Sequence, residues 1–420
     1  MAPTEAGNFW EFPKVRNSLQ ARWLLFHWRT NATMFQKIKT DIRNLYQIPE
    51  TKDFSLLFAF NPSHEMALVR NCADYAPTKN VAMMEKQLWK LPFIWAGEDD
   101  CVFNIGTGEI IDAHGNRVDV SSRILIPFPC GWNLAVREWF LEAGIDERVM
   151  PGEGCLQTLR TFAGRSFACD YIHELLSSIP ADMRDRLVGN HMKFHQSVDT
   201  VRFDAAMMIF KQPWSSSGRG NFCAASLDEM TVKRLEASVK KQGGFLADIF
   251  YHKTLDFAME FYVFADGNVE FIGYSLFQAE KNGKYVGNMV ESQKIVRKTI
   301  ALAMGGDNGL LDALKEKHLE MLRRTVAGLY CGFVGIDMMV VNNEDHISVH
   351  PCVEINFRMN MGIMAMYAYL RPFLFDFLEE EEDSEDGAVW RSSILEPPSL
   401  MRERGFHTVL KSRFISIRYS

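Results

Sequence analysis

The strongest constraint on the fold lies near the end of the chain, where polar and apolar residues alternate. Between Val353 and Phe357 the odd-numbered residues are apolar, whereas Glu354, Asn356 and the following Arg358 are polar. Side chains of a β-strand point alternately to its two faces. This segment therefore predicts a strand with one buried face and one face that carries all three polar side chains.

A second strand is expected just before this one. The stretch Phe333–Asn342 is followed by a turn at Asn343–Asp345, which predicts a β-hairpin. If the two strands pair, Asp337 can share the polar face with Glu354. Two carboxylates and the amide oxygen of Asn356 form an all-oxygen site of the kind that suits Mg²⁺. A solvated polar face of an antiparallel sheet is the alternative.

A second candidate site follows the predicted strand Ala205–Gln212, which carries Lys211 near its end. The loop after it consists of three serines, two glycines and an arginine: Ser215, Ser216, Ser217, Gly218, Arg219 and Gly220. Small residues let backbone N–H groups surround an anion, and Lys211 and Arg219 add positive charge. The loop is no Walker A motif, because no Gly-Lys-Ser/Thr follows at the right distance. A flexible surface loop is the alternative.

Alternating strands and helices predict a mostly parallel α/β domain from Phe54 to about Arg165. Its predicted strands include Phe54–Phe60 and Pro92–Ala96, and a helix is expected at Leu156–Leu176. Loops at strand ends often bind ligands, so His64 and Glu65 are candidates for facing a substrate, with a plain turn and helix cap as the alternative.

Four segments are expected along the chain: an N-terminal extension at 1–53, the α/β domain at 54–165, a second α/β domain at 166–377, and a tail at 378–420. Seven carboxylates occupy the eight positions Glu379–Asp386, and such a run stays solvated at a domain end. The i,i+4 pair His191 and His195 has no evident third ligand and is expected to be exposed.

Together these pieces resemble the ATP-grasp superfamily over roughly residues 166–377. The resemblance rests on the Lys211 strand with its Gly/Ser-rich loop, a later hinge strand, and the Asp337…Glu354-x-Asn356-x-Arg358 pattern followed by Met361-Gly362. It implies an α/β fold in which two lobes clasp a nucleotide, preceded by a parallel α/β domain. It also implies that ATP and one or two Mg²⁺ ions, or Mn²⁺, are the cofactors.

The resemblance also implies roles for single residues. Lys211 and the loop Ser215–Gly220 would contact the ATP phosphates, while Asp337, Glu354 and Asn356 would hold the metal. Arg358, with Lys211 and Arg219, would stabilise the transferring phosphoryl group. Three further candidates line the nucleotide site: Asp248 on the hinge strand, Glu260 on the next strand, and Arg165 in place of a family lysine. The hinge departs from the family pattern at Ala247, which is often glutamate, and an exposed carboxylate is the alternative for Glu260.

The implied activity is ATP-dependent ligation of a carboxylate to an amine through an acylphosphate. A phosphotransferase on the same fold and a non-catalytic nucleotide-binding protein are the alternatives. The substrates would be small or peptide-like molecules, but no motif identifies them, and a homo-oligomer stays open.

The bulk composition limits the partners and the compartment. A formal net charge of −7 does not favour nucleic acid or an anionic membrane surface. No apolar run reaches the roughly 20 residues of a membrane span, and residues 1–10 lack the pattern of a signal peptide. No two of the eight cysteines form a CxxC pair, so we expect reduced thiols in a cytoplasmic protein.

Overall fold

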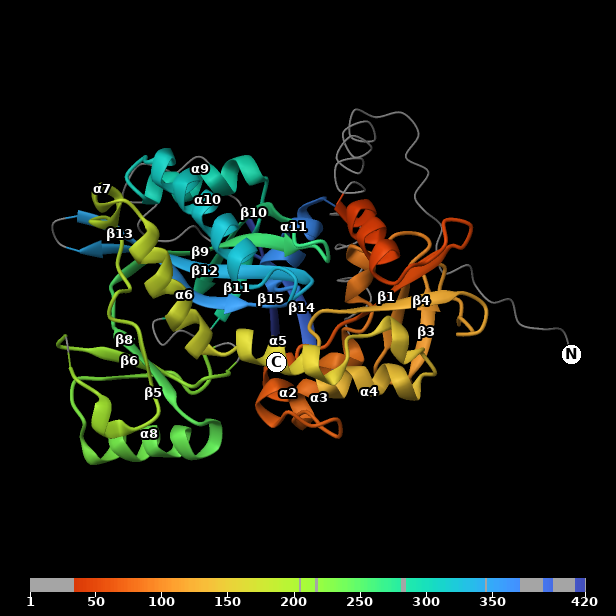
Figure 1. Cartoon of the computed structure of the whole chain (residues 1–420), viewed down its shortest axis with the longest axis horizontal. Coiled ribbons are helices and arrows are strands. Elements are labelled where there is room, and N and C mark those ends of the chain that lie inside the picture. Colours follow the sequence, from red (N-terminus) through yellow and green to blue (C-terminus); the bar gives the residue numbers. More distant parts are fainter. Residues whose placement is uncertain are drawn as a thin grey trace, which may run out of the picture.

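The computed structural model describes residues 34–203, 205–215, 218–280, 285–343 and 346–370, and the backbone of 388–395 and 412–419. Three β-sheets with helices around them make up this part of the chain (Figure 1). The predictions for 1–33, Ser216, Ser217 and Glu379–Asp386 lie outside the described residues. Every described helix is too short or too polar to cross a lipid bilayer.

The first sheet is four-stranded, with the order β3-β2-β1-β4. Strand β1 is parallel to β2 and β4, whereas β3 is antiparallel to β2. All six residues of β1 are buried, because α4 packs on one face of the sheet and a helix at 34–45 on the other. The elements of this region are β1 (Phe54–Ala59), α2 (His64–Arg70), α3 (Lys79–Gln87), η1 (Leu91–Ile94), β2 (Cys101–Asn104), β3 (Glu109–Asp112), β4 (Ile124–Pro129), α4 (Leu134–Glu142), η2 (Glu147–Val149) and α5 (Glu153–Phe162).

The helix at 34–45 joins this region to the rest of the protein, although its residues fall in the segment expected to be an N-terminal extension. The Phe35 ring lies edge-on to Phe58 of β1 at 5.7 Å and to Phe333 of the large sheet at 6.4 Å between ring centroids. The Asp41 carboxylate accepts hydrogen bonds from the backbone N–H of Ala265 at 3.0 and 3.1 Å. Apolar packing and hydrogen bonding therefore hold the first region against the large sheet.

The large sheet has seven antiparallel strands in the order β13-β12-β9-β10-β11-β15-β14. Helices α6, α9 and α10 cover one of its faces, and α11 contacts β9, β10 and β11. Its strands and helices are α6 (Arg165–Ser178), α7 (Ala181–Arg184), β9 (Lys253–Val263), β10 (Val269–Ala279), β11 (Tyr285–Val290), α9 (Gln293–Ala303), α10 (Asn308–Thr325), β12 (Gly332–Asn343), β13 (His346–Asn356), α11 (Met361–Leu370), β14 (Ala388–Leu395) and β15 (Ser412–Tyr419).

Period-two alternation gives the large sheet two chemically different faces. In β9 and β12, Phe257, Met259, Ile336 and Met338 point into the core beneath the helices. The residues between them point to the opposite face. That face carries the polar side chains of the candidate site, as the sequence predicted.

The third sheet is small and antiparallel, with the order β5-β8-β6-β7. Helix α8 packs Leu235 against Phe210 and Phe245, and Gly243 ends the helix in the left-handed conformation with φ = 82°. The elements are β5 (Lys193–His195), η3 (Val198–Thr200), β6 (Met208–Lys211), β7 (Phe222–Ala224), α8 (Glu229–Gln242) and β8 (Phe245–Ile249).

The predicted α/β class is confirmed, but three local predictions were wrong. The stretch expected as strand Pro92–Ala96 is the 3₁₀ helix η1, because Pro92 near its start fixes a helical φ. The helix expected at Leu156–Leu176 divides into α5 and α6 at Gly164, which has extended backbone. His195 was expected to be exposed but is buried on strand β5, where its Nδ1 lies 2.7 Å from Oγ1 of Thr200.

We predict that Ile38→Ala lowers the free energy of unfolding by about 2–5 kcal/mol, because Ile38 is fully buried between the first region and the large sheet. Denaturant unfolding followed by tryptophan fluorescence measures this. Lys37→Ala is the neighbouring control, since Lys37 is half exposed and forms only a surface ion pair with Glu270, at a cost of about 1 kcal/mol or less. Equal effects of the two substitutions would show that the helix at 34–45 does not support the core.

Candidate functional site

The centre of the candidate site is a pair of carboxylates on neighbouring strands. Asp337 of β12 and Glu354 of β13 are direct partners in the strand register, and Asn356 pairs with Gly335. Burial raises the pKa of Asp337 well above its usual range, and the nearby charges of Glu354 and Glu260 raise it further. The predicted metal-binding residues therefore lie together on the polar face.

The donor set fits a hard divalent cation. Mg²⁺ is commonly held by one or two carboxylates together with water and substrate phosphates. No cluster of three or more His, Cys, Asp or Glu side chains forms a metal site among the residues that the structure covers. Asp337 and Glu354 are two carboxylates in direct register, and the Asn356 amide supplies a third oxygen. The amide of Asn356 bonds Asp337 and accepts from Arg358 at 3.1 Å. A divalent ion would offset the repulsion between the two carboxylates.

Arg165, at the start of α6, connects this centre with the loop after Lys211. Its guanidinium donates to Oε1 of Glu354 at 2.8 Å and to Oγ of Ser215 at 2.8 Å. It also donates to the backbone oxygen of Gln212 at 2.5 Å. Its side chain is only 3% exposed. Arg165 therefore bonds protein groups on both sides of the site, and its expected contact with a nucleotide stays a prediction.

Lys211 is a buried cation that has no anionic partner among the described residues. Within the described part of the chain, its ammonium group forms neither a hydrogen bond nor an ion pair, and the residue is 9% exposed. Burial lowers the pKa of Lys211, and the charge of Arg165 lowers it further, whereas Glu354, Asp248 and Asp337 oppose the shift. A buried ammonium is costly unless it is paired. Lys211 is thus prepared to receive an anionic group.

The described part of the Ser/Gly loop lies over the same centre. Ser215 is buried, whereas Arg219 and Gly220 are exposed. Gly218 and Gly220 have φ of 71° and 79°, a left-handed conformation that residues with a side chain rarely adopt. The loop therefore needs glycine at both positions to make its turn.

One cavity, of about 580 Å³, lies between the small sheet and the large sheet. Lys211, Asp337 and Glu354 are at its edge, and the segment Asp248–Asp256 forms one wall. Its apolar lining comprises Ile209, Ile249, Phe250, Leu255, Leu276, Phe277, Ala279, Met289, Met338, Met339 and Val353. A flat apolar ring with an anionic tail would match this combination of walls.

Two carboxylates of the hinge segment and the strand after it, Asp248 and Asp256, line the cavity with different bonding partners. Asp248 lines the cavity, but one of its oxygens bonds Nε2 of the buried His350 at 3.1 Å and the other bonds the backbone N–H of Ile249. Asp256 also lines the cavity and pairs with Lys253 at 2.5 Å. Asp256 and Lys253 were not predicted from the sequence, because their i,i+3 spacing carries no signal on a strand, where side chains alternate with a period of two.

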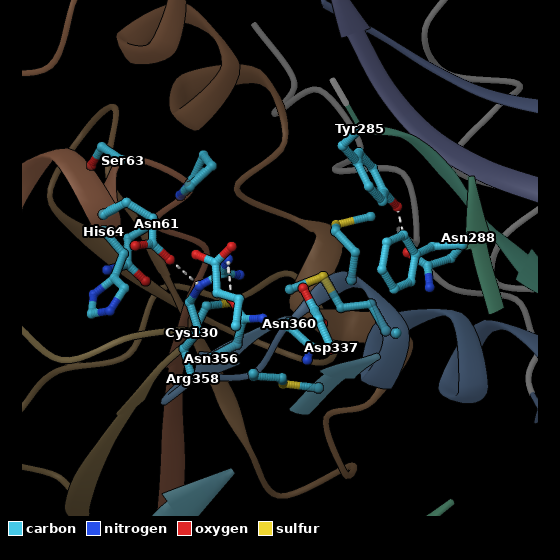
Figure 2. A pocket seen from close by; sticks show the side chains of 18 of the residues that line it. Asn61, Ser63, His64, Cys130, Tyr285, Asn288, Asp337, Asn356, Arg358 and Asn360 are labelled. Atoms are coloured by element: carbon cyan, nitrogen blue, oxygen red, sulfur yellow. Dashed lines mark hydrogen bonds and ion pairs between the residues drawn. The ribbon is translucent and has the colours of Figure 1, made fainter. Parts of the chain in front are cut away.

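A second cavity, of about 270 Å³, lies between the first region and the polar face of the large sheet. Figure 2 shows Asn61, Ser63 and His64 of the first region on one side and Tyr285 and Asn288 of β11 on the other. The two cavities share five lining residues: Gly218, Phe277, Ala279, Asp337 and Glu354. They therefore meet at the carboxylate pair.

An ion pair between the two regions borders the second cavity. Nε of Arg358 donates to Oε1 of Glu65 at 2.7 Å. Burial lowers the pKa of His64 to about 3, and the charge of Arg358 contributes, so His64 is neutral at physiological pH. Glu65 thus lines the second cavity and pairs with Arg358, while its expected contact with a substrate stays a prediction.

Glu260 lies beneath the second cavity and does not line the first one. It is fully buried, and its two oxygens accept from Oγ of Ser275 at 2.7 Å and Nδ2 of Asn360 at 2.8 Å. A Cβ on Gly362 would lie 2.3 Å from Oε1 of Glu260. This close approach explains the glycine of the Met361-Gly362 pair: the start of α11 rests on the Glu260 carboxyl.

No family model matches the chain, and no curated protein matches it. Among solved structures, the chain is similar to a D-alanyl-alanine synthetase A from Vibrio cholerae, with 12% identity, a TM-score of 0.41, and coverage of 79% of this chain and 98% of that chain. It is similar to a RimK domain protein ATP-grasp from Sphaerobacter thermophilus, with 12% identity, a TM-score of 0.35, and coverage of 77% and 100%.

A biotin carboxylase–β-γ-ATP complex from Campylobacter jejuni is also similar, with 12% identity, a TM-score of 0.38, and coverage of 60% of this chain and 55% of that chain. The chain thus spans about half the length of that carboxylase. At such TM-scores the matches assign neither activity nor substrate.

We predict that Glu260→Gln flattens the pH dependence of stability between pH 5 and 8. Burial raises the pKa of Glu260 to about 7 from 4.5, so the folded protein holds this proton more tightly than the unfolded chain. The resulting stabilisation is complete below about pH 4.5 and is lost as the pH rises through about 7.

Glutamine cannot titrate, so the fall in unfolding free energy toward pH 8 should shrink by up to about 3 kcal/mol. Guanidinium unfolding at four pH values measures the difference. Parallel curves for both proteins would refute this account of Glu260.

Proposed function

We propose that the chain is an ATP- and Mg²⁺-dependent ligase that joins a carboxylate to an amine through an acylphosphate. The observation that carries this proposal is the buried Lys211, which has no anionic partner in the described part of the chain and lines one of two cavities that meet at Asp337 and Glu354. A group transferred from a ligand in one cavity to a ligand in the other must pass this point.

The nucleotide occupies the cavity between the small and large sheets. Its base lies among the apolar side chains, and the backbone of the hinge segment near Ile249 and Phe250 bonds the ring edge. The phosphates reach Lys211 and the loop Ser215–Gly220, where Arg219 on the exposed part of the loop adds a further cation. Asp248 and Asp256 are the carboxylates of this cavity that can bond the ribose.

Asp337, Glu354 and Asn356 would hold the metal. When bound, Mg²⁺ would neutralise charge on the transferring phosphoryl group. Because Arg165 bonds Glu354 and Ser215 together, it sets the distance between the metal-binding carboxylate and the base of the loop.

The second cavity receives the carboxylate substrate. A carboxylate oxygen attacks the γ-phosphorus, the bond to the β–γ bridging oxygen breaks, and ADP leaves. An amine then attacks the acyl carbon, and phosphate and a proton are released. Arg358, held by Glu65, faces this reaction and stabilises negative charge as it develops. Closure of the loop over the site excludes water, which would hydrolyse the acylphosphate.

Three wider features complete the proposal. The domain division at 54–165 and 166–377 separates the region that forms one wall of the second cavity from the region that holds the nucleotide. A cytoplasmic location and small-molecule substrates accompany this function. Stable nucleic-acid or membrane partners are not part of it.

We predict that Lys211→Met weakens binding of a non-hydrolysable ATP analogue by about 10- to 100-fold, since a charge-assisted hydrogen bond contributes about 1.5–3 kcal/mol. Isothermal titration calorimetry measures the affinity. Lys240→Met on the exposed side of α8 is the matched control and should bind like the parent protein. Unchanged affinity in Lys211→Met would remove the main support for the nucleotide site.

We predict that Asp337→Asn removes most of the effect of Mg²⁺ on nucleotide affinity. Without Mg²⁺ the variant should bind the analogue as tightly as the parent or more tightly, because one carboxylate no longer repels the phosphates. With Mg²⁺ the parent should gain affinity and the variant should gain much less, and ADP formation should fall by 100-fold or more. An equal Mg²⁺ effect in both proteins would argue against Asp337 as a metal ligand.

A further inference from the structure

The second cavity also indicates which carboxylates it accepts. Building on the proposed ligase function, we infer that the carboxylate substrate carries an apolar side chain that packs against a methionine-rich wall. The lining of this cavity divides into apolar side chains and polar side chains that are already bonded within the protein.

The apolar part of the wall comes from both sides of the cavity. Met66 of α2 and Met84 of α3 line it from the first region, and Met361 lines it from the start of α11. All three methionines are partly exposed. Val81 and Phe277 extend the same surface.

The polar groups of the first region are already bonded. Asn61 donates to the backbone oxygen of Gly131 and accepts from its N–H. Nδ1 of His64 lies 3.3 Å from the amide of Asn133. The hydroxyl of Ser63 bonds the buried Glu85. These side chains line the cavity without offering it their principal hydrogen-bonding groups.

The polar side chains on the floor of the cavity are also hydrogen-bonded within the protein. Both oxygens of Glu260 are taken by Ser275 and Asn360. The Asn288 amide accepts from the hydroxyl of Tyr285 and donates to the backbone oxygen of Leu276. The charged groups concentrate instead at the reaction centre, where the Glu65–Arg358 pair meets Asp337 and Glu354, while Arg219 lies exposed in the loop. The cavity is thus charged at one end and apolar along its wall.

This distribution favours an amphiphilic ligand. A polar side chain would give up its hydrogen bonds to water and gain no partner at the methionine wall, at a cost of about 1–3 kcal/mol. That cost corresponds to about 10- to 100-fold in selectivity. Because methionine is unbranched and adaptable, the wall should accept several apolar side chains of different shape.

The test uses hydroxylamine as a general amine, because it converts an acylphosphate to a hydroxamate without knowledge of the natural amine. The carboxylates are matched pairs of similar shape: L-leucine with L-asparagine, L-valine with L-threonine, and L-methionine with L-glutamine. A pair without the α-amino group, 4-methylpentanoate with succinamate, covers substrates that are not amino acids. We expect hydroxamate and ADP from the apolar members, with kcat/KM at least tenfold above that of their polar partners.

Substitutions in the methionine-rich wall test whether this wall causes the preference for apolar carboxylates. Met66→Gln and Met84→Gln should each reduce the ratio of apolar to polar kcat/KM by fivefold or more, with nucleotide affinity unchanged. Met230→Gln is the control, because Met230 is 71% exposed on α8, far from the cavity lining. An unchanged ratio in both cavity variants would overturn the inference.

Nucleotide affinity, measured separately by calorimetry, distinguishes two kinds of failure. If the Mg²⁺–nucleotide complex forms but the polar members react as well as the apolar ones, or none reacts, the inference is wrong and the nucleotide site stands. If the protein binds no nucleotide, the proposed function fails first and the inference fails with it.

Discussion

The site depends on like charges held close together inside the protein. The pairing of β12 with β13 places Asp337 beside Glu354, and both residues are partly buried. Arg165 and Lys211 lie close enough to affect this electrostatic environment, but only Arg165 bonds one of the carboxylates. An arrangement with two adjacent carboxylates and an ammonium group that has no anionic partner among the described residues becomes favourable when a metal ion and an anion fill it. The proposed affinity for a nucleotide thus rests on the charge balance of the fold itself.

The same face of the large sheet connects the two cavities. Strands β12 and β13 line both cavities. Asp337 and Glu354 lie where the cavities meet, and Arg358 lies toward the first region and lines only the second cavity. The helix at 34–45 and the Glu65–Arg358 ion pair hold the first region against this sheet. The geometry of the second cavity therefore depends on packing between segments that are distant in sequence.

The sequence predicted those parts of the site that follow from local periodicity. Alternation in β13 was sufficient to place Glu354, Asn356 and Arg358 on one face, and the turn before it predicted the position of Asp337. Long-range contacts were not predictable in this way. The partner of Arg358 lies 293 residues away at Glu65, and Glu260 lies below the second cavity because Gly362 and Asn360 fold back over it. Pro92 was read as part of a strand because apolar residues surround it, whereas its ring favours the 3₁₀ turn.

A crystal structure with Mg²⁺ and a non-hydrolysable ATP analogue tests the central claim most directly. The account predicts the terminal phosphate within hydrogen-bonding distance of the Lys211 ammonium and a metal ion coordinated by Asp337 and Glu354, with the base between the small and large sheets. A nucleotide bound elsewhere, or a phosphate chain that leaves Lys211 and both carboxylates without contact, would contradict it.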